Sequence, residues 1–117
     1  QMQSTSDMLC EAAGMRPVKV KIKANEIELD SGKLIPANFA PQHFHEIWIH
    51  PDMRQGRCIA HELAHKWVQE DEGLLDSHGS RFQGRLAFLL ARLVPTDQIA
   101  LQGHLEASMR EYGLDPV

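Results

Sequence analysis

The pentapeptide His61-Glu62-Leu63-Ala64-His65 constrains the fold of this chain more than any other stretch of the sequence. Four residues advance an α-helix by about 400°, so two histidines at this spacing lie on one helix face, about 6 Å apart along the axis. Both imidazoles can then reach one Zn²⁺ at about 2.0–2.1 Å. The carboxylate of Glu62 projects beside that pair, where it could accept a proton from an activated water molecule. The pattern predicts a helix that carries part of a metal site.

The chain has seven histidines, so the context of the pentapeptide must decide between a metal site and a chance match. Apolar residues recur at helical spacing on both sides of it, from Met53 to Val68. Asp52 and Gln55 have the spacing of a capping box. We therefore expect an amphipathic helix from about residue 52 to residue 70, with its regular part beginning near Arg57.

The other patterns predict an α+β fold in a single domain of residues 1–117. The strands are expected to form one small three-stranded mixed or antiparallel sheet, and residues 26–33 add an alternating stretch and a turn. The helix after the pentapeptide is expected to bury Phe82 in its apolar stripe. In chain order we expect an N-terminal helix over 6–15, strands over 18–23, 34–40 and 46–50, the pentapeptide helix, and two C-terminal helices over about 78–94 and 97–112.

The composition is that of an ordinary soluble globular protein, with 43% hydrophobic and 24% charged residues in 117. The sequence shows no signal peptide and no apolar run long enough to cross a membrane. We interpret Cys10 and Cys58 as reduced thiols. These observations predict a cytoplasmic monomer. The net charge of −4 argues against non-specific binding to nucleic acid, and we expect the alternating lysines of residues 19–23 to form a solvated face or a charged sheet edge.

A catalytic zinc site usually has three protein ligands and leaves one position for water. His78 is the best-placed third ligand, because twelve residues separate it from His65 and allow the chain to turn and start another helix. Gly79 follows it and can provide a tight turn. The acidic residues 70–72 come too soon after the helix to fold back. The weaker candidates are His43, His45 and His50 beside a strand, His104 in the last helix, and Cys58 three residues before His61.

The motif H-E-x-x-H at residues 61–65, followed by H-G-x-x-F at residues 78–82, resembles the SprT-like zinc metallopeptidases, which include the Spartan-type proteases. The resemblance covers roughly residues 18–94, with Ser77 in place of the first glycine of the family's G-H-G-x-x-F stretch. It implies a polypeptide substrate and a minimal zincin-like fold. It also suggests association with DNA, which the net charge and the lack of a Cys-rich zinc ribbon do not support. The implied cofactor is one catalytic Zn²⁺, held by His61, His65 and His78.

We therefore expect a zinc metallopeptidase in which Glu62 is the general base toward an activated water molecule. An edge strand, taken as residues 46–50, would align an extended peptide by main-chain pairing. His50, His45 and Tyr112 are candidates for contacts with the substrate or the oxyanion. Two other interpretations stay open: a non-peptidase zinc hydrolase, such as a small ribonuclease with three zinc-bound histidines, and a zinc-containing binding domain without turnover.

Overall fold

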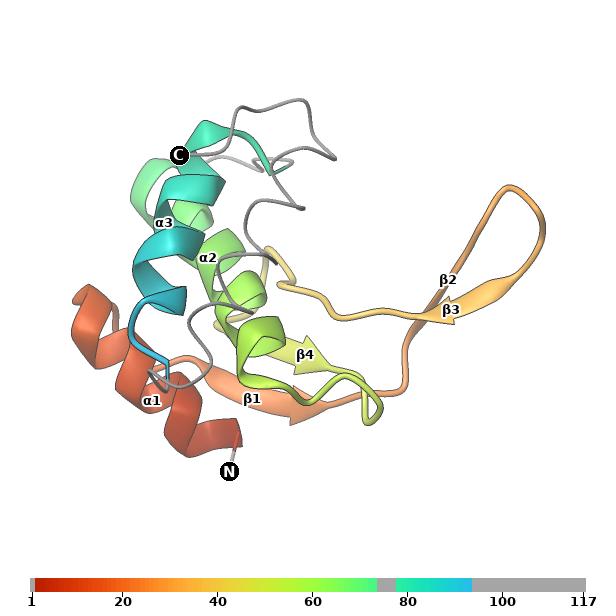
Figure 1. Ribbon diagram of the computed structural model, residues 1–117, viewed down its shortest axis with the longest axis horizontal. Helices are drawn as coiled ribbons and strands as arrows, with labels where there is room; N and C mark the ends of the chain where they lie inside the picture. Colours follow the sequence, from red (N-terminus) through yellow and green to blue (C-terminus); the bar gives the residue numbers. More distant parts are fainter. Residues whose placement is uncertain (1, 74–77, 94–117) are drawn as a thin grey trace.

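The computed structural model describes residues 2–73 and 78–93, and within them the expected α+β class is confirmed (Figure 1). No helix in this described part is long and apolar enough to cross a membrane. The helix expected over 97–112 lies outside the described residues. The observed elements are α1 (Met2–Ala13), β1 (Lys19–Ile22), β2 (Glu26–Glu28), β3 (Leu34–Pro36), β4 (Glu46–Ile49), α2 (Gly56–Glu72) and α3 (Ser80–Leu90).

The four described strands form two separate two-stranded sheets, so the expectation of a single three-stranded sheet is wrong. Strands β1 and β4 pair in parallel, with Lys19 opposite Glu46 and Ile22 opposite Ile49. Strands β2 and β3 form an antiparallel hairpin that projects away from the helices (Figure 1). Parallel neighbours need a long crossover connection. Here the crossover itself folds into the hairpin and leaves only β1 and β4 to pair beneath the helices.

The hydrophobic core lies between the three described helices and the β1–β4 sheet (Figure 1). Helix α2 is central, because it packs against α1, α3 and β4. Alternation along β4 points Ile47 and Ile49 into this core. The other buried apolar residues of the core are Leu9, Cys10, Val18, Ile59, Ala60, Leu63, Ala64, Val68, Phe82, Leu86, Leu89 and Leu90.

Helix α1 begins at Met2, about one turn earlier than expected, because its first turn makes tertiary hydrogen bonds with β1. Nε2 of Gln3 donates to the carbonyl of Val18 at 3.0 Å, and the amide of Val20 donates to Oε1 of Gln3 at 2.9 Å. The hydroxyl of buried Ser6 donates to the same Val18 carbonyl at 3.1 Å. These bonds satisfy main-chain groups at the outer edge of β1 and hold α1 beside it.

Helix α2 begins at Gly56, with Gln55 as its N-cap residue and no side-chain capping bond. The expected capping by Asp52 is wrong, because the chain makes a tight turn there. The amide of Met53 donates to the carbonyl of His50 at 2.9 Å, and the amide of Asp52 donates to Nδ1 of His50 at 3.0 Å. This turn reverses the chain directly after β4 and places α2 on the sheet.

The three lysines of β1 and its C-terminal end lie on the face of the sheet that is turned away from the core. Nζ of Lys21 lies 3.2 Å from a carboxylate oxygen of Glu46. Nζ of Lys23 lies 3.8 Å from the centroid of the Trp48 ring. The lysines form a charged sheet surface, as expected.

Candidate metal centre

Helix α2 carries His61 and His65 at the margin of its buried face. Both imidazoles are half-buried, and their ring centroids lie 5.1 Å apart. Residues Leu63 and Ala64, between them, are fully buried in the core. The expected placement of the pentapeptide on one face of an amphipathic helix is confirmed.

His78 completes a cluster of three histidines. Its Nε2 atom lies 3.0 Å from Nε2 of His61 and 3.0 Å from Nε2 of His65. The turn expected at Gly79 is made instead by His78, whose φ is 66°, while Gly79 has extended backbone with φ −72° and ψ −169°. Nε2 of buried Gln83 donates to the carbonyl of His78 at 3.3 Å and helps to hold this conformation.

The three nitrogen atoms have the spacing of ligands around one metal ion. Nitrogens bound to a tetrahedral ion at about 2.0–2.1 Å lie about 3.3 Å apart, close to the observed 3.0 Å. Hydrogen bonding explains the cluster less well, because Nε2 of a neutral imidazole is either a donor or an acceptor and cannot satisfy two neighbours at once. Imidazole suits zinc, copper, iron and nickel. The residues present therefore fit a bound metal ion.

Phe82 packs against all three imidazoles of the cluster. Its ring is fully buried, with centroid distances of 4.8 Å to His61, 4.3 Å to His65 and 4.8 Å to His78. Its expected place in the apolar stripe of α3 is confirmed, but its contact with the three clustered histidines was not predicted. The signal in the sequence was the short spacing of four residues from His78, which keeps Phe82, in the first turn of α3, near that histidine.

Glu62 follows His61 in α2, about 100° further round the helix. Its side chain is buried, with 7% exposure. Burial raises the pKa of the Glu62 carboxyl to about 8, because desolvation disfavours the charged form. The metal-free protein thus holds a proton on this carboxyl at neutral pH. A cation nearby lowers the pKa of a carboxyl and favours its ionised form.

Two other sequence candidates, His45 and His50, do not belong to the three-histidine cluster. Nδ1 of His45 pairs with the carboxylate of Glu70, and its Nε2 lies 3.4 Å from the carbonyl of Arg16. His50 is buried, and its Nδ1 accepts the hydrogen bond from the amide of Asp52. The structure thus places both histidines in contacts with their own surroundings and outside the ligand set.

Both cysteines are free thiols, Cys10 buried and Cys58 half-buried. Sγ of Cys58 donates to Oε1 of Gln55 at 3.2 Å, and Cys58 is not part of the ligand cluster found in the described part of the chain. Burial raises the pKa of both thiols and so disfavours the metal-binding thiolate. Two further sequence candidates, Tyr112 and His104, lie outside the described residues.

The outer edge of β4 is already paired, so the expectation that it receives a peptide is wrong. The amide of Phe39 donates to the carbonyl of Trp48 at 2.9 Å, and the amide of Trp48 donates back at 2.8 Å. The amide of His50 donates to Oδ1 of Asn38 at 2.7 Å. Residues 37–45, which we call the edge segment, therefore occupy the outer side of β4.

Two residues of α2 hold the edge segment in place, and sequence reasoning did not find either. Lys66 is 2% exposed, and its Nζ lies 3.2 Å from Oε1 of Gln69. Burial lowers the pKa of Lys66. A buried lysine has no periodic signature, so only its tertiary partners reveal its role. Lys66 donates to the carbonyls of Pro41, at 2.6 Å, and Phe44, while Nε2 of Gln69 donates to the carbonyl of Ala40 at 2.9 Å.

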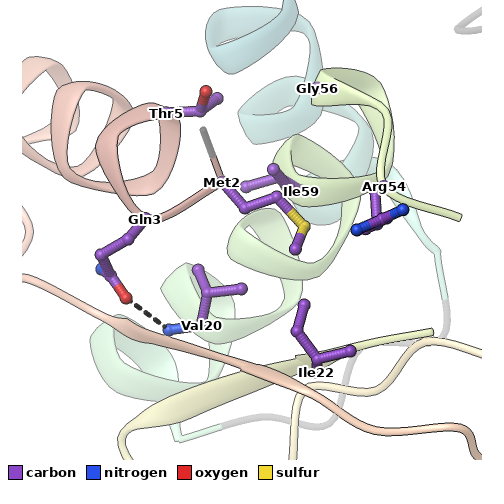
Figure 2. Close-up of a pocket in the computed structure, with 8 residues that line it drawn as sticks. All are labelled: Met2, Gln3, Thr5, Val20, Ile22, Arg54, Gly56 and Ile59. Atoms are coloured by element: carbon purple, nitrogen blue, oxygen red, sulfur yellow. Dashed lines mark hydrogen bonds between the residues drawn. The ribbon is translucent and has the colours of Figure 1, made fainter. Parts of the chain in front are cut away.

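A pocket of about 690 Å³ lies between α1, β1 and the start of α2 (Figure 2). Met2, Val20, Ile22 and Ile59 give it an apolar lining, and Arg54 lies at its side. None of the three clustered histidines lines this pocket. It is therefore separate from the metal centre.

The structure brings together three residues singled out from the sequence, His61 and His65 of α2 and His78 just before α3, and Glu62 follows His61 in the same helix. Phe82 contacts all three imidazoles. Comparison with protein-family models, with curated proteins and with solved structures yields no match, so the site itself carries the interpretation.

Proposed function

We propose that this chain is a zinc-dependent peptidase that hydrolyses polypeptides. The observation that carries the proposal is the buried carboxyl of Glu62, which directly follows His61 in α2. The same helix carries His65, and both histidines belong to the cluster of three. A three-histidine metal site with a neighbouring general base is the arrangement that hydrolytic zinc enzymes need. The resemblance of the two motifs to SprT-like metallopeptidases supports peptide bonds as the target.

When it is bound by the three histidines, Zn²⁺ supplies Lewis acidity that activates water and polarises a carbonyl group. The histidines are neutral ligands, so the site keeps a positive charge that favours the carboxylate form of Glu62. Glu62 takes a proton from the attacking water molecule onto its carboxylate and passes it to the leaving amine. Phe82 restricts the three rings to one orientation and thereby keeps the ligand set assembled.

The edge segment replaces β4 as the element that aligns the substrate. Main-chain groups of successive residues in an extended chain point to opposite sides, so Asn38 points its N–H and C=O away from β4 when Phe39 bonds to it. Neither group of Asn38 has a hydrogen-bond partner among residues 2–73 and 78–93. An extended peptide pairs with this free edge and lies along it as an added strand.

The test combines metal analysis with peptidase assays on the full chain. Purified protein is expected to contain zinc, to lose hydrolysis with a chelator and to regain it with added zinc. Glu62→Gln is expected to retain zinc and to lower the rate of hydrolysis about 10²–10⁴-fold, because it removes the general base. His78→Ala is expected to lose zinc, whereas His45→Ala, outside the cluster, is the matched control for metal binding and should retain zinc.

Two results contradict the proposal. Full zinc occupancy of His78→Ala would show that the ligand set is wrong. Undiminished hydrolysis by Glu62→Gln would exclude this carboxyl as the base. Stoichiometric zinc without hydrolysis of any peptide would instead identify a zinc-containing binding domain.

A further inference from the structure

Hairpin β2–β3 carries large apolar side chains that no other described residue covers. Exposure reaches 43% for Ile27, 41% for Leu29 and 54% for Leu34. The hairpin projects beyond the helices in Figure 1, and all three residues of β2 are exposed. Apolar side chains gathered on one exposed element indicate an interaction surface.

The hairpin is a hydrogen-bonded ladder with two distinct faces. The amide of Leu29 donates to the carbonyl of Lys33 at 2.8 Å, beyond the paired residues of β2 and β3. Ile27 lies opposite Ile35 in the register. Because alternate residues share a face, Leu29 lies on the same side as these two isoleucines. One face of the hairpin therefore groups three aliphatic side chains, with Lys33 beside them opposite Leu29.

The opposite face of the hairpin carries acidic side chains beside Leu34 and Pro36. Glu26 and Glu28 alternate with the aliphatic residues and lie on the other face, and Asp30 follows in the turn. Lys33 is the only cationic residue between residues 26 and 36. In the part of the chain that the structure describes, none of the three carboxylates forms an ion pair. A partner that complements this hairpin combines aliphatic with basic side chains.

The hairpin and the edge segment share one extended backbone. Lys33 and Ala37 bond to the β2 side, and Phe39 bonds to β4. All three residues are odd-numbered, so β2 and β4 lie on the same edge of the stretch, and none of residues 2–73 and 78–93 pairs with the main chain of its other edge. Pro36, which has no N–H to offer, lies on that open edge, where proline is tolerated in strands. Figure 1 shows this stretch leading from the hairpin back toward the body of the protein.

We propose that hairpin β2–β3 is a docking arm for an extended, unfolded polypeptide with aliphatic and basic side chains. The inference rests on the proposed function, because the docked polypeptide is also the substrate. Its aliphatic side chains pack on the face of Ile27 and Leu29, and its basic side chains pair with Glu26 and Glu28. Its main chain continues along the edge segment, which Lys66 fastens to the helix that carries the metal ligands.

The test measures binding without turnover, in zinc-loaded full chain carrying Glu62→Gln. The probe is an unstructured synthetic peptide of leucine, lysine and serine with a fluorescent label, followed by anisotropy. The double substitution Ile27→Ser/Leu29→Ser is expected to weaken binding about tenfold or more. Met8→Ser on α1 is the matched control, since Met8 is 42% exposed but far from the hairpin in sequence, and it should leave the affinity unchanged.

A charge reversal tests the arm without removing its aliphatic side chains. Glu26→Lys/Glu28→Lys is expected to weaken binding of the lysine peptide about tenfold and to strengthen binding of the same peptide with glutamate in place of lysine. Unchanged affinities in both double variants would overturn the proposal. A dimer that both double variants dissociate, seen by analytical ultracentrifugation, would also overturn it, because a second copy would then cover the hairpin.

The arm and the proposed function fail in different ways. If wild-type chain cleaves no peptide but the hairpin variants still lose binding, the peptidase proposal fails and the arm stands. The opposite outcome has two parts: wild type and hairpin variants cleave a peptide too short to reach the hairpin at the same rate, and they bind the long peptide with the same affinity. In that case the docking arm is wrong and the peptidase proposal stands.

Discussion

Helices α2 and α3 bury most of their apolar side chains, whereas hairpin β2–β3 exposes those of its own. Leu86 is fully buried, while Leu34 in the hairpin is 54% exposed. The helices pack against each other and the β1–β4 sheet, but the hairpin has only two short strands and no second layer. Apolar side chains in this chain therefore occupy two different environments, one buried and one exposed to solvent. In the helices they hold the three clustered histidines in place, and in the hairpin they stay exposed.

The largest expected effect comes from removing the Phe82 ring, which packs against the three clustered histidines. Phe82→Ala should lower the free energy of unfolding of the metal-free protein by about 3–5 kcal/mol, because it leaves a cavity in the core. Zinc affinity should fall as well, since the three imidazoles lose the ring that restricts them. Denaturant unfolding and zinc titration measure the two effects. Phe88→Ala, on the same helix but packed against Trp67, should leave the zinc affinity unchanged; an equal loss there would show that Phe82 acts through stability alone.

The second prediction concerns the pH dependence of the stability of the metal-free protein. The pKa of Glu62 is raised from 4.5 to about 8 in the folded state, so between these values the folded protein binds one more proton than the unfolded chain. The contribution of Glu62 to stability is therefore largest at the acidic end and falls as pH rises, by about 1.4 kcal/mol per unit and on the order of 3–5 kcal/mol in total. Unfolding at pH 5 to 8, compared with Glu62→Gln, measures this difference. Parallel pH profiles of the two proteins would contradict a buried, protonated Glu62.

The smallest expected effect is in the hairpin. Leu34→Ala should change the free energy of unfolding by less than about 0.5 kcal/mol, because Leu34 is mostly in water already. Leu86→Ala in α3 should cost about 2–5 kcal/mol in the same denaturant experiment. Similar losses for the two leucines would show that the hairpin is packed in solution, and would remove the contrast between the two regions.

Much of the helical part could be predicted from sequence, because its signals are local. The period of apolar residues around the pentapeptide places His61 and His65 on one face of α2, whatever the rest of the chain does. The position of His78 beside His61 and His65 could be predicted from the length of chain needed to turn back. Helix boundaries were less certain: α1 starts earlier than expected because Gln3 bonds to β1, a contact that no local pattern shows.

The strands were harder to predict, because alternation shows that a stretch is extended but not which stretch it pairs with. Residues 26–29 and 34–36 alternate as expected, yet they pair only with each other. The outer edge of β4 was expected to be open, but Phe39 pairs with Trp48 across it. Pairing partners far apart in sequence are decided by the whole fold.

The sequence by itself determined the types of the candidate ligands and the spacing of two of them, since four residues in a helix always bring two side chains to one face. Only the tertiary structure decided that His78 lies 3.0 Å from both and that Glu62 is buried. It also decided that Lys66 reaches the carbonyl of Pro41, 25 residues away in the chain. The physical reason is that burial and long-range hydrogen bonds exist only once distant segments pack together, whereas helical spacing is present in the chain before it folds.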